Sequence, residues 1–137
     1  MSTTRVVAGH PGSTEIADQL IDLYLSGKKL AGSSLLEDYL TAGEPLPQAG
    51  DHWIALASNG DPRCILRTER VEIHAFLEVP ERIAQAEGEG DLSLKYWRDV
   101  HTQHYATHLR EWGLADIEEA TVVTEFFSLV FPEKSRK

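Results

Sequence analysis

Apolar residues recur every three or four positions through much of the chain, which is the spacing of one buried helix face. This spacing predicts helices over residues 13–29, 33–43 and 91–113. Pro80 stands at a position that favours the start of a helix, so a further short helix is predicted there, and it ends among the glycines of residues 87–90.

Capping residues bound these predicted helices. Glycines at positions 27, 43 and 113 follow three of them, where a left-handed residue commonly ends a helix. The expected caps at the starts are Ser13 or Thr14, then Ser34 with Glu37 at capping-box spacing, then Asp91 or Ser93.

β-Branched and aromatic residues dominate three other segments, which predicts strands over residues 52–58, 63–79 and 120–131, with 63–79 forming either one long strand or two short ones. An Asn-Gly pair at residues 59–60 joins the first two as a hairpin. Helices followed by strands, another helix and a last strand indicate an α+β fold. We expect an antiparallel sheet or a small barrel flanked by helices.

Composition narrows the possible functions. The chain has 137 residues and a net charge of −9, which predicts one domain and argues against a broad basic surface for long nucleic acid. The single cysteine, Cys64, suits a reducing cytoplasm, and its apolar neighbours predict a buried structural thiol. We see no leader peptide, and no run approaches the ~20 apolar residues of a membrane span. We therefore expect a cytoplasmic protein with no membrane partner.

Lys28 and Lys29 follow the end of the first predicted helix. They do not belong to a phosphate-binding loop, because Asp22 stands where that motif needs glycine. Cations at this place interact favourably with the helix dipole. The functional alternative is that one lysine points into a cleft as a general base or an anion clamp.

Three histidines, His101, His104 and His108, share one face of the longest predicted helix with Trp97 and Trp112. Imidazoles one turn apart can share a metal ion, but the pattern of a zinc protease helix is absent. A stripe bracketed by tryptophans is more typical of a packed face. We expect His101 to be partly buried, oriented by a hydrogen bond and free of metal.

The segment "EGEGD" at residues 87–91 precedes that helix. Asp91 is explained as a cap, but Glu87 and Glu89 are not. A carboxylate beside a lysine can share a proton with it, as acid–base chemistry near neutral pH requires. Gly88 and Gly90 would let the backbone approach a flat ligand closely.

Four blocks in this order resemble the ASCH (activating signal cointegrator homology) family, in its small bacterial single-domain branch. They read "ADQLIDLYLSGKKLAGSSLL", "LPQAGDHWIAL", "PRCILRTERVEIHAFLEV" and "EGEGDLSLKYWRDVH". The resemblance covers residues 10–131 as a single domain and leaves 1–9 and 132–137 as flexible termini. It implies a PUA-like fold, in which helices surround a small β-barrel and a cleft lies between them. Family members are associated with RNA binding, some remove the acyl group from N4-acetylcytidine, and at least one is described as a metal-dependent ribonuclease.

In the family's amidohydrolases a lysine and a threonine three residues later act with a glutamate. By position the lysine corresponds to Lys29 and the glutamate to Glu87, with Glu89 as a competing alignment. Gly32 occupies the threonine position and has no side chain that can attack a substrate. The resemblance therefore implies Lys29 and Glu87 as the proton-handling pair. Ser33 and Ser34 are the hydroxyls adjacent to residue 32, and Ser33 is our candidate for a substitute nucleophile or a residue that holds water.

Three functions follow as hypotheses. The first is a hydrolase of a modified nucleoside. The second is a non-catalytic module for a nucleoside or single-stranded RNA, with Trp53 or Trp97 stacking on a base. The third is a metal-dependent ribonuclease that uses the histidine stripe. Ligand contacts are expected from Lys28, Ser34, Glu89, Asp91, Trp97 and Arg98, and no metal or other cofactor is expected. RNA would need a local basic patch, which Lys28, Lys29, Arg63, Arg67 and Arg98 would form if they converge.

Overall fold

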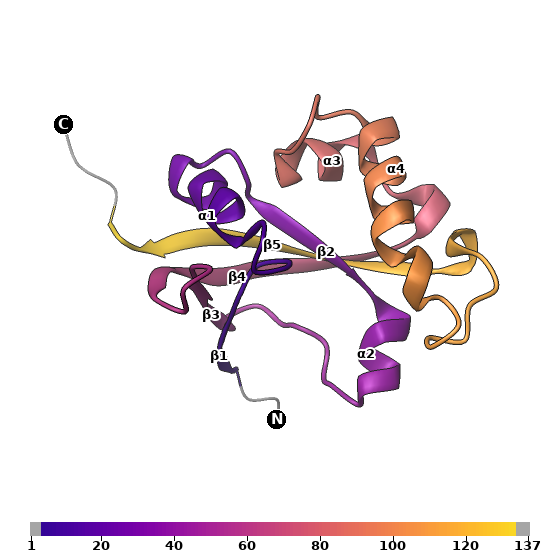
Figure 1. Cartoon of the computed structure of the whole chain (residues 1–137), viewed down its shortest axis with the longest axis horizontal. Coiled ribbons are helices and arrows are strands. Elements are labelled where there is room, and N and C mark those ends of the chain that lie inside the picture. The colour runs from indigo at the N-terminus through magenta and orange to yellow at the C-terminus, as the bar shows by residue number, and fades with distance from the viewer. Residues whose placement is uncertain (1–3, 134–137) are drawn as a thin grey trace.

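A five-stranded sheet forms the centre of the computed structural model, which describes residues 4–133 (Figure 1). The strands are β1 (Val6–Gly9), β2 (Ala31–Leu35), β3 (His52–Leu56), β4 (Pro62–Ala75) and β5 (Thr121–Phe131), in the spatial order β1-β3-β4-β5-β2. The β1–β3 pair is parallel and the other three pairs are antiparallel. Within residues 4–133 the edge strands β1 and β2 do not pair with each other, so the sheet curves without closing into a barrel.

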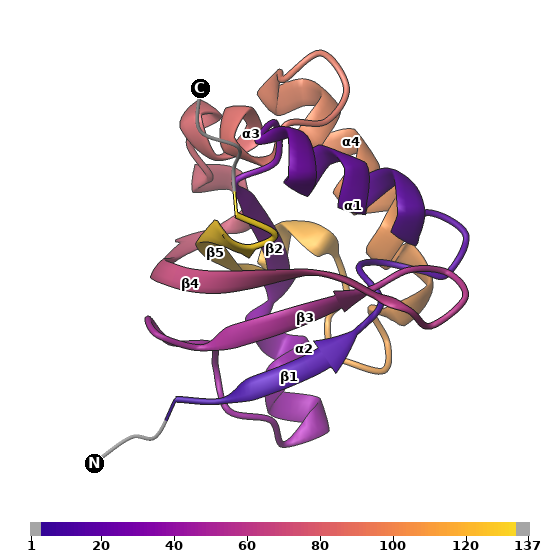
Figure 2. The same cartoon turned by 90° about the vertical axis from the view of Figure 1, so that its left-hand side faces the viewer.

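Four α-helices accompany the sheet: α1 (Ala17–Ser26), α2 (Leu36–Ala42), α3 (Glu81–Glu87) and α4 (Leu94–Tyr105). Helices α1, α3 and α4 gather on one side of the strands, and α2 lies toward the opposite side (Figure 2). In the part of the chain that the structure describes, no helix has the length and apolar character needed to cross a bilayer.

The predicted hairpin and final strand are confirmed. β3 and β4 pair antiparallel across a turn in which Gly60 has φ of 89°. The segment 63–79 supplies one long strand, β4, whose register shifts between Thr68 and Arg70 at a bulge. Cys64 is buried, as its apolar neighbours indicate.

Two strands were not predicted. Val6–Gly9 form β1, although residues 1–9 were expected to be a flexible terminus. The expected flexible termini also include residues 1–3 and 134–137, which lie outside the described residues. Ala31–Leu35 form β2, although the second helix was predicted to start at residue 33. The backbone of this segment is paired with β5, and a main chain bonded into a sheet cannot also start a helix.

Most of the capping residues predicted at helix starts are wrong, whereas most of those predicted at helix ends are confirmed. Ser34 lies in β2, and α2 begins after Leu35 without a side-chain cap. Helix α1 begins after Ile16, also without a side-chain cap, rather than at Ser13 or Thr14. Ser93 does cap α4, since its hydroxyl accepts a hydrogen bond from the backbone N–H of Tyr96. Gly27 and Gly43 end α1 and α2 in the left-handed conformation.

The longest helix is shorter than predicted. α4 ends at Tyr105, and a 3-10 turn over Ala106–His108 and further turns continue to Gly113. Threonine, histidine and tyrosine dominate residues 101–108, and these residue types form helix less readily than alanine or leucine. His108 thus lies in the 3-10 turn, whereas His101 and His104 lie in α4.

Two apolar cores pack the helices against different strands of the sheet. One packs α1 on β3 and β4, and includes Ile21, Tyr24, Ala55 and Leu66. The other packs α3 and α4 on β2 and β5, and includes Leu35, Ile83, Trp97 and Val122. β2 is an edge strand, so side chains beside it can reach the space between α1 and α4.

Candidate functional site

The site begins where the chain leaves α1. The backbone N–H groups of Lys28 and Lys29 both donate to the carbonyl of Leu23, which turns the chain sharply after Gly27. One residue later, the N–H of Leu30 donates to the carbonyl of Ala86 on α3 at 2.6 Å. These bonds hold the segment before β2 against the end of α3. They place Lys29 inside the molecule, where only 5% of the residue is exposed.

The Lys29 ammonium contacts both candidate carboxylates. Its Nζ lies 2.8 Å from Glu89 Oε2 and 3.6 Å from Glu87 Oε1, and it donates to the backbone carbonyl of Glu87 at 3.2 Å. A buried ammonium is costly unless carboxylates and carbonyls replace its water. Contact with Lys29 therefore does not decide whether Glu87 or Glu89 corresponds to the family glutamate.

A hydrogen bond from a hydroxyl group distinguishes Glu87 from Glu89. Ser33 Oγ donates to Glu87 Oε2 at 2.6 Å, and Trp97 Nε1 donates to the same oxygen at 2.5 Å. His101 Nε2 lies 3.7 Å from Glu87 Oε1. Glu87 is almost fully buried and collects groups from β2, from α4 and from the turn after α1. It is therefore Glu87 that joins the lysine to a hydroxyl.

Ser33 is fixed by the strand that carries it. In β2, Ser33 pairs with Thr124 of β5, and the two hydroxyl oxygens lie 2.8 Å apart. The Tyr105 hydroxyl donates to the Ser33 carbonyl at 3.2 Å. Side chains alternate along a strand, so Ser33 faces α3 and α4 while Gly32, opposite Glu125, faces the other side. The hydroxyl next to Glu87 thus belongs to residue 33 and not to residue 32.

A cavity of about 260 Å³ opens beside these groups. Its polar wall includes Lys29, Ser33, Glu87, Glu89, His101 and Glu125. Tyr24, Trp53 and Phe127 supply an aromatic wall, in which the Tyr24 ring meets the other two edge to face at centroid distances of 5.9 and 5.3 Å. Burial raises the pKa of the Tyr24 hydroxyl, so this wall stays uncharged at neutral pH. The cavity has one polar side and one flat apolar side.

The two glycines in "EGEGD" serve the fold. Gly88 ends α3 with φ of 71°, and a Cβ there would lie 2.0 Å from the carbonyl oxygen of Lys28. At Gly90, with φ of 60°, a Cβ would lie 2.4 Å from the nearest carbon of the Tyr96 ring. These glycines were expected to let the backbone approach a ligand. In the structure, Gly88 lets the end of α3 approach the segment that carries Lys28 and Lys29, which brings Glu87 to Lys29.

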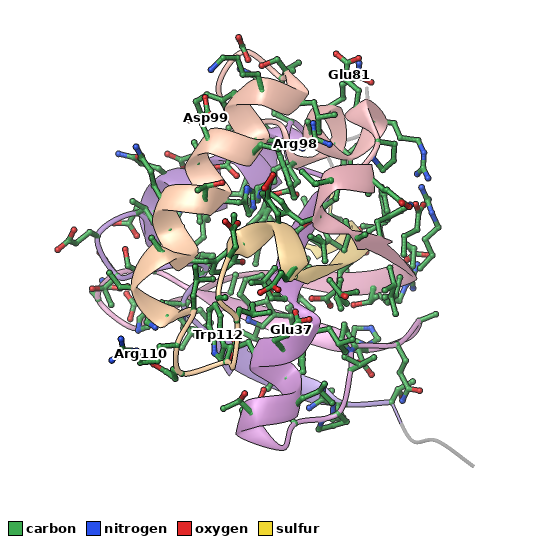
Figure 3. All side chains as sticks on the ribbon, turned by 90° about the vertical axis from the view of Figure 1, so that its right-hand side faces the viewer. Glu37, Glu81, Arg98, Asp99, Arg110 and Trp112 are labelled. Carbon is green, nitrogen blue, oxygen red and sulfur yellow. The ribbon has the colours of Figure 1, made fainter. Side chains whose placement is uncertain are left out.

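The predicted ligand contacts divide into two sets. Ser34 and Glu89 line the cavity. Lys28 is exposed and outside the cavity lining, and Asp91 is exposed and accepts from the backbone N–H of Ser93. Trp97 is 3% exposed, which leaves no ring face for a base. Arg98 lies between α4 and α3 and donates to the carbonyl of Leu77 (Figure 3).

The predicted basic patch does not form in the cavity. Of Lys28, Lys29, Arg63, Arg67 and Arg98, only Lys29 lines it. Arg67 instead pairs with Glu69 on the surface at 2.7 Å. The cavity is lined by one lysine and by the carboxyl groups of Glu87, Glu89 and Glu125, so acidic groups outnumber lysine and arginine there.

His101 is partly buried and oriented by a hydrogen bond, as predicted: its Nδ1 lies 2.7 Å from the carbonyl of Trp97. A carbonyl only accepts, so Nδ1 carries a proton and Nε2 faces Glu87. His104 also lines the cavity, and burial, followed by the neighbouring histidines, lowers its pKa. His108 stacks on Trp112. Across residues 4–133, no three His, Cys, Asp or Glu side chains are grouped so that they could hold a metal ion.

Several site residues escaped prediction: Tyr24, Thr68, Tyr105, Thr124, Glu125 and Phe127. A signal existed for two of them. Thr124 and Glu125 interrupt an otherwise apolar strand, "ATVVTEFFSLVF", and a polar pair in such a run indicates a special environment. Tyr24 and Phe127 gave no signal, because aromatic residues at these spacings are equally typical of a core.

The open, helix-flanked sheet with a cleft beside its edge strand defines a PUA-like α+β protein. A model of the ASCH domain matches residues 8–131, and the chain belongs to the ASCH domain family, whose members generally bind RNA. The predicted family and fold class are thereby confirmed. A comparison with curated proteins gives no match.

Several solved structures have a fold similar to that of this chain. An ASCH domain from Lactobacillus crispatus JV V101 is 31% identical with a TM-score of 0.84, over 93% of this chain and 80% of that one. A protein from Enterococcus faecalis V583 is 30% identical with a TM-score of 0.79, over 100% of this chain and 88% of that one. The ASCH protein of Zymomonas mobilis shares the fold at 11% identity, with a TM-score of 0.51 over 92% and 70% of the two chains.

Proposed function

We propose that the cavity binds a nucleoside whose exocyclic amine is acylated, as in N4-acetylcytidine, and hydrolyses the amide. One observation carries the proposal: a strand hydroxyl, Ser33, donates to a buried carboxylate, Glu87, which also contacts the ammonium of Lys29. A nucleophile, a base within hydrogen-bond reach and a cation in one cavity are the parts that acyl transfer needs.

The proposed reaction has two steps, acylation of Ser33 and hydrolysis of the resulting ester. Glu87 takes the proton of the Ser33 hydroxyl while Oγ attacks the acyl carbon, and the carbonyl oxygen becomes an oxyanion. Lys29 stabilises that negative charge. The C–N bond then breaks, Glu87 returns the proton to the departing amine, and cytidine leaves. Water attacks the acyl–serine ester with the same base, which releases the carboxylic acid and restores Ser33.

The surrounding groups support these roles. Thr124 fixes the serine hydroxyl from the opposite strand, and Trp97 fixes the carboxylate, so neither must reorganise during the reaction. Glu89 is the closest carboxylate to Lys29 and keeps the ammonium positioned. The volume of about 260 Å³ is near the lower end for small-molecule pockets, and it suits a nucleoside better than a longer ligand.

The test is hydrolysis of N4-acetylcytidine, followed by the release of cytidine. We expect the wild-type protein to turn over, and Ser33→Ala, Glu87→Gln and Lys29→Ala each to lower kcat by ~10²-fold or more while the circular dichroism spectrum is retained. Ser128→Ala is the matched control. Ser128 also donates to a glutamate from a strand, at 2.7 Å to Glu69, but outside the cavity.

Two results would contradict the proposal. A full rate for Ser33→Ala would mean that water attacks the substrate directly, and the serine would lose its role. An absence of turnover in the wild-type protein, together with an absence of nucleoside binding, would remove the function as a whole.

A non-catalytic role in binding RNA is the second candidate. It is favoured by the family's general association with RNA and by Trp53, a half-buried aromatic side chain in the cavity wall. An unpaired base could enter the cavity and contact this wall. Retained binding of a single-stranded oligonucleotide without hydrolysis would favour it.

A further inference from the structure

Glu125 is a carboxylic acid in the cavity wall with no role in the proposed reaction. It lies on β5, opposite Gly32 of β2 and Val71 of β4. Thr68 Oγ1 donates to its Oε1 at 3.0 Å. Within residues 4–133 no lysine, arginine or histidine nitrogen lies within 4.0 Å of its carboxylate. One oxygen is therefore held by a threonine, and the group has no counter-ion there.

The position of Glu125 is central to the cleft. It lines the first cavity and also a second one, of about 360 Å³, beside α2 and β1. The two cavities share Gly12, Ser34, Trp53, Thr68 and Glu125 in their linings. A ligand that enters between α1 and α4 thus reaches Glu125 at the junction.

Burial favours the neutral form of this acid. The pKa of Glu125 is raised, mainly by burial and further by the charge of Asp51, while the Thr68 hydrogen bond and Arg5 oppose the shift. Other titratable groups in the two cavity walls are Lys29, Glu87, Glu89, His101, His104, Tyr24, Tyr39, Tyr105, Glu44, His10 and His52. A protonated carboxyl group can donate one hydrogen bond and accept others, whereas a carboxylate can only accept.

The walls around Glu125 suit a planar ring. Gly32 has no side chain, and a Cβ there would meet only the Phe127 ring, at 3.8 Å. Trp53, Leu66 and Phe127 line the same space. A flat heterocycle can therefore lie over Gly32 with its polar edge toward Glu125.

On the basis of the proposed function, we propose that Glu125, held by Thr68, is a positioning residue that hydrogen-bonds as a neutral acid to the polar edge of the ligand's heterocycle. A pyrimidine such as cytosine offers ring and carbonyl acceptors beside an exocyclic N–H donor, which a carboxylic acid can satisfy together. The residue selects for an uncharged ring and takes no part in bond breaking.

The experiment is calorimetric binding of cytidine, the reaction product, from about pH 5 to about pH 9. The protonated acid binds, so the wild-type affinity is full at low pH and falls as the pH rises through the raised pKa of Glu125. We expect a loss of about tenfold, the size of one hydrogen bond to a buried group. Glu125→Gln keeps a donor and an acceptor at every pH, so it should remove this part of the pH dependence, and Glu125→Ala should bind about tenfold more weakly at low pH.

Glu69→Gln is the matched control, because Glu69 also accepts from a hydroxyl, Ser128, but lies outside both cavities. It should keep the wild-type profile. An unchanged pH profile in Glu125→Gln, wild-type affinity in Glu125→Ala, or no cytidine binding at any pH would each overturn the inference. Binding is measured without turnover, so an inactive protein with the expected profile would refute only the hydrolase.

Discussion

Glu87 is the residue on which the site depends. Its carboxylate accepts from Ser33 and Trp97, faces His101 and contacts Lys29, so groups from three elements converge on one buried anion. Burial of a charge is unfavourable unless nearly every lone pair finds a donor. The chain satisfies this requirement with residues that are up to 58 positions apart in sequence.

Gly32 provides the prediction at this scale. Its φ is not in the left-handed region, and a Cβ would make only ordinary contact with Phe127. Gly32→Thr should therefore fold and should raise the free energy of unfolding by about 0.5–1 kcal/mol, because glycine is unfavourable within a strand. Chemical denaturation measures this change. A threonine here faces Glu125, so it should not restore hydrolysis to Ser33→Ala. A double variant with near wild-type turnover would show that residue 32 also reaches the reacting atoms.

At the scale of elements, the site exists because the ends of two helices meet an edge strand. The turn after α1 brings Lys29, the end of α3 brings Glu87, and the edge strand β2 brings Ser33. The N–H of Leu30 and the carbonyl of Ala86 join the first two segments directly. The geometry of the proposed catalytic groups should thus be sensitive to Gly88, where these two segments touch.

Gly88→Ala tests this close approach. The left-handed conformation alone costs a residue with a side chain about 1–2 kcal/mol. Gly43→Ala is the matched control for that cost, because Gly43 has φ of 69° and open space around it. The alanine methyl at residue 88 would in addition overlap the Lys28 carbonyl. We expect a loss of about 3 kcal/mol or more in urea unfolding for Gly88→Ala. Equal losses in the two variants would mean that the contact with Lys28 is easily relieved.

The sequence predicted the elements that depend on local pattern. The α1 periodicity, the Asn-Gly turn and the left-handed glycines are encoded within a few residues, and they were recovered. β2 was missed because "AGSSL" has weak strand character and is held by its pairing with β5, some 90 positions away. Lys29 and Glu87 came from the family resemblance, whereas the contact between Glu125 and Thr68 needed the fold, since no local spacing relates strands β4 and β5.

For the whole molecule, both the negative net charge and the lining of the cavity favour a small ligand over a long nucleic acid. The net charge is −9, and the main cavity combines one lysine with three carboxyl groups. Phosphate contacts dominate affinity for nucleic acid, and each one requires a cation. Contact with RNA is thereby confined to a local patch, while an uncharged nucleoside meets no such barrier. The acidic balance of the molecule is thus compatible with the proposed binding of a single uncharged base.

The most direct test of this account is a crystal structure of the protein soaked with cytidine at a concentration that saturates binding in solution. We expect cytidine in the cavity between α1 and α4, with its exocyclic amine toward Ser33 and Lys29 and its ring against the aromatic wall. Cytidine bound on another face, or an empty cavity under those conditions, would contradict the claim that Lys29, Ser33 and Glu87 form the functional site.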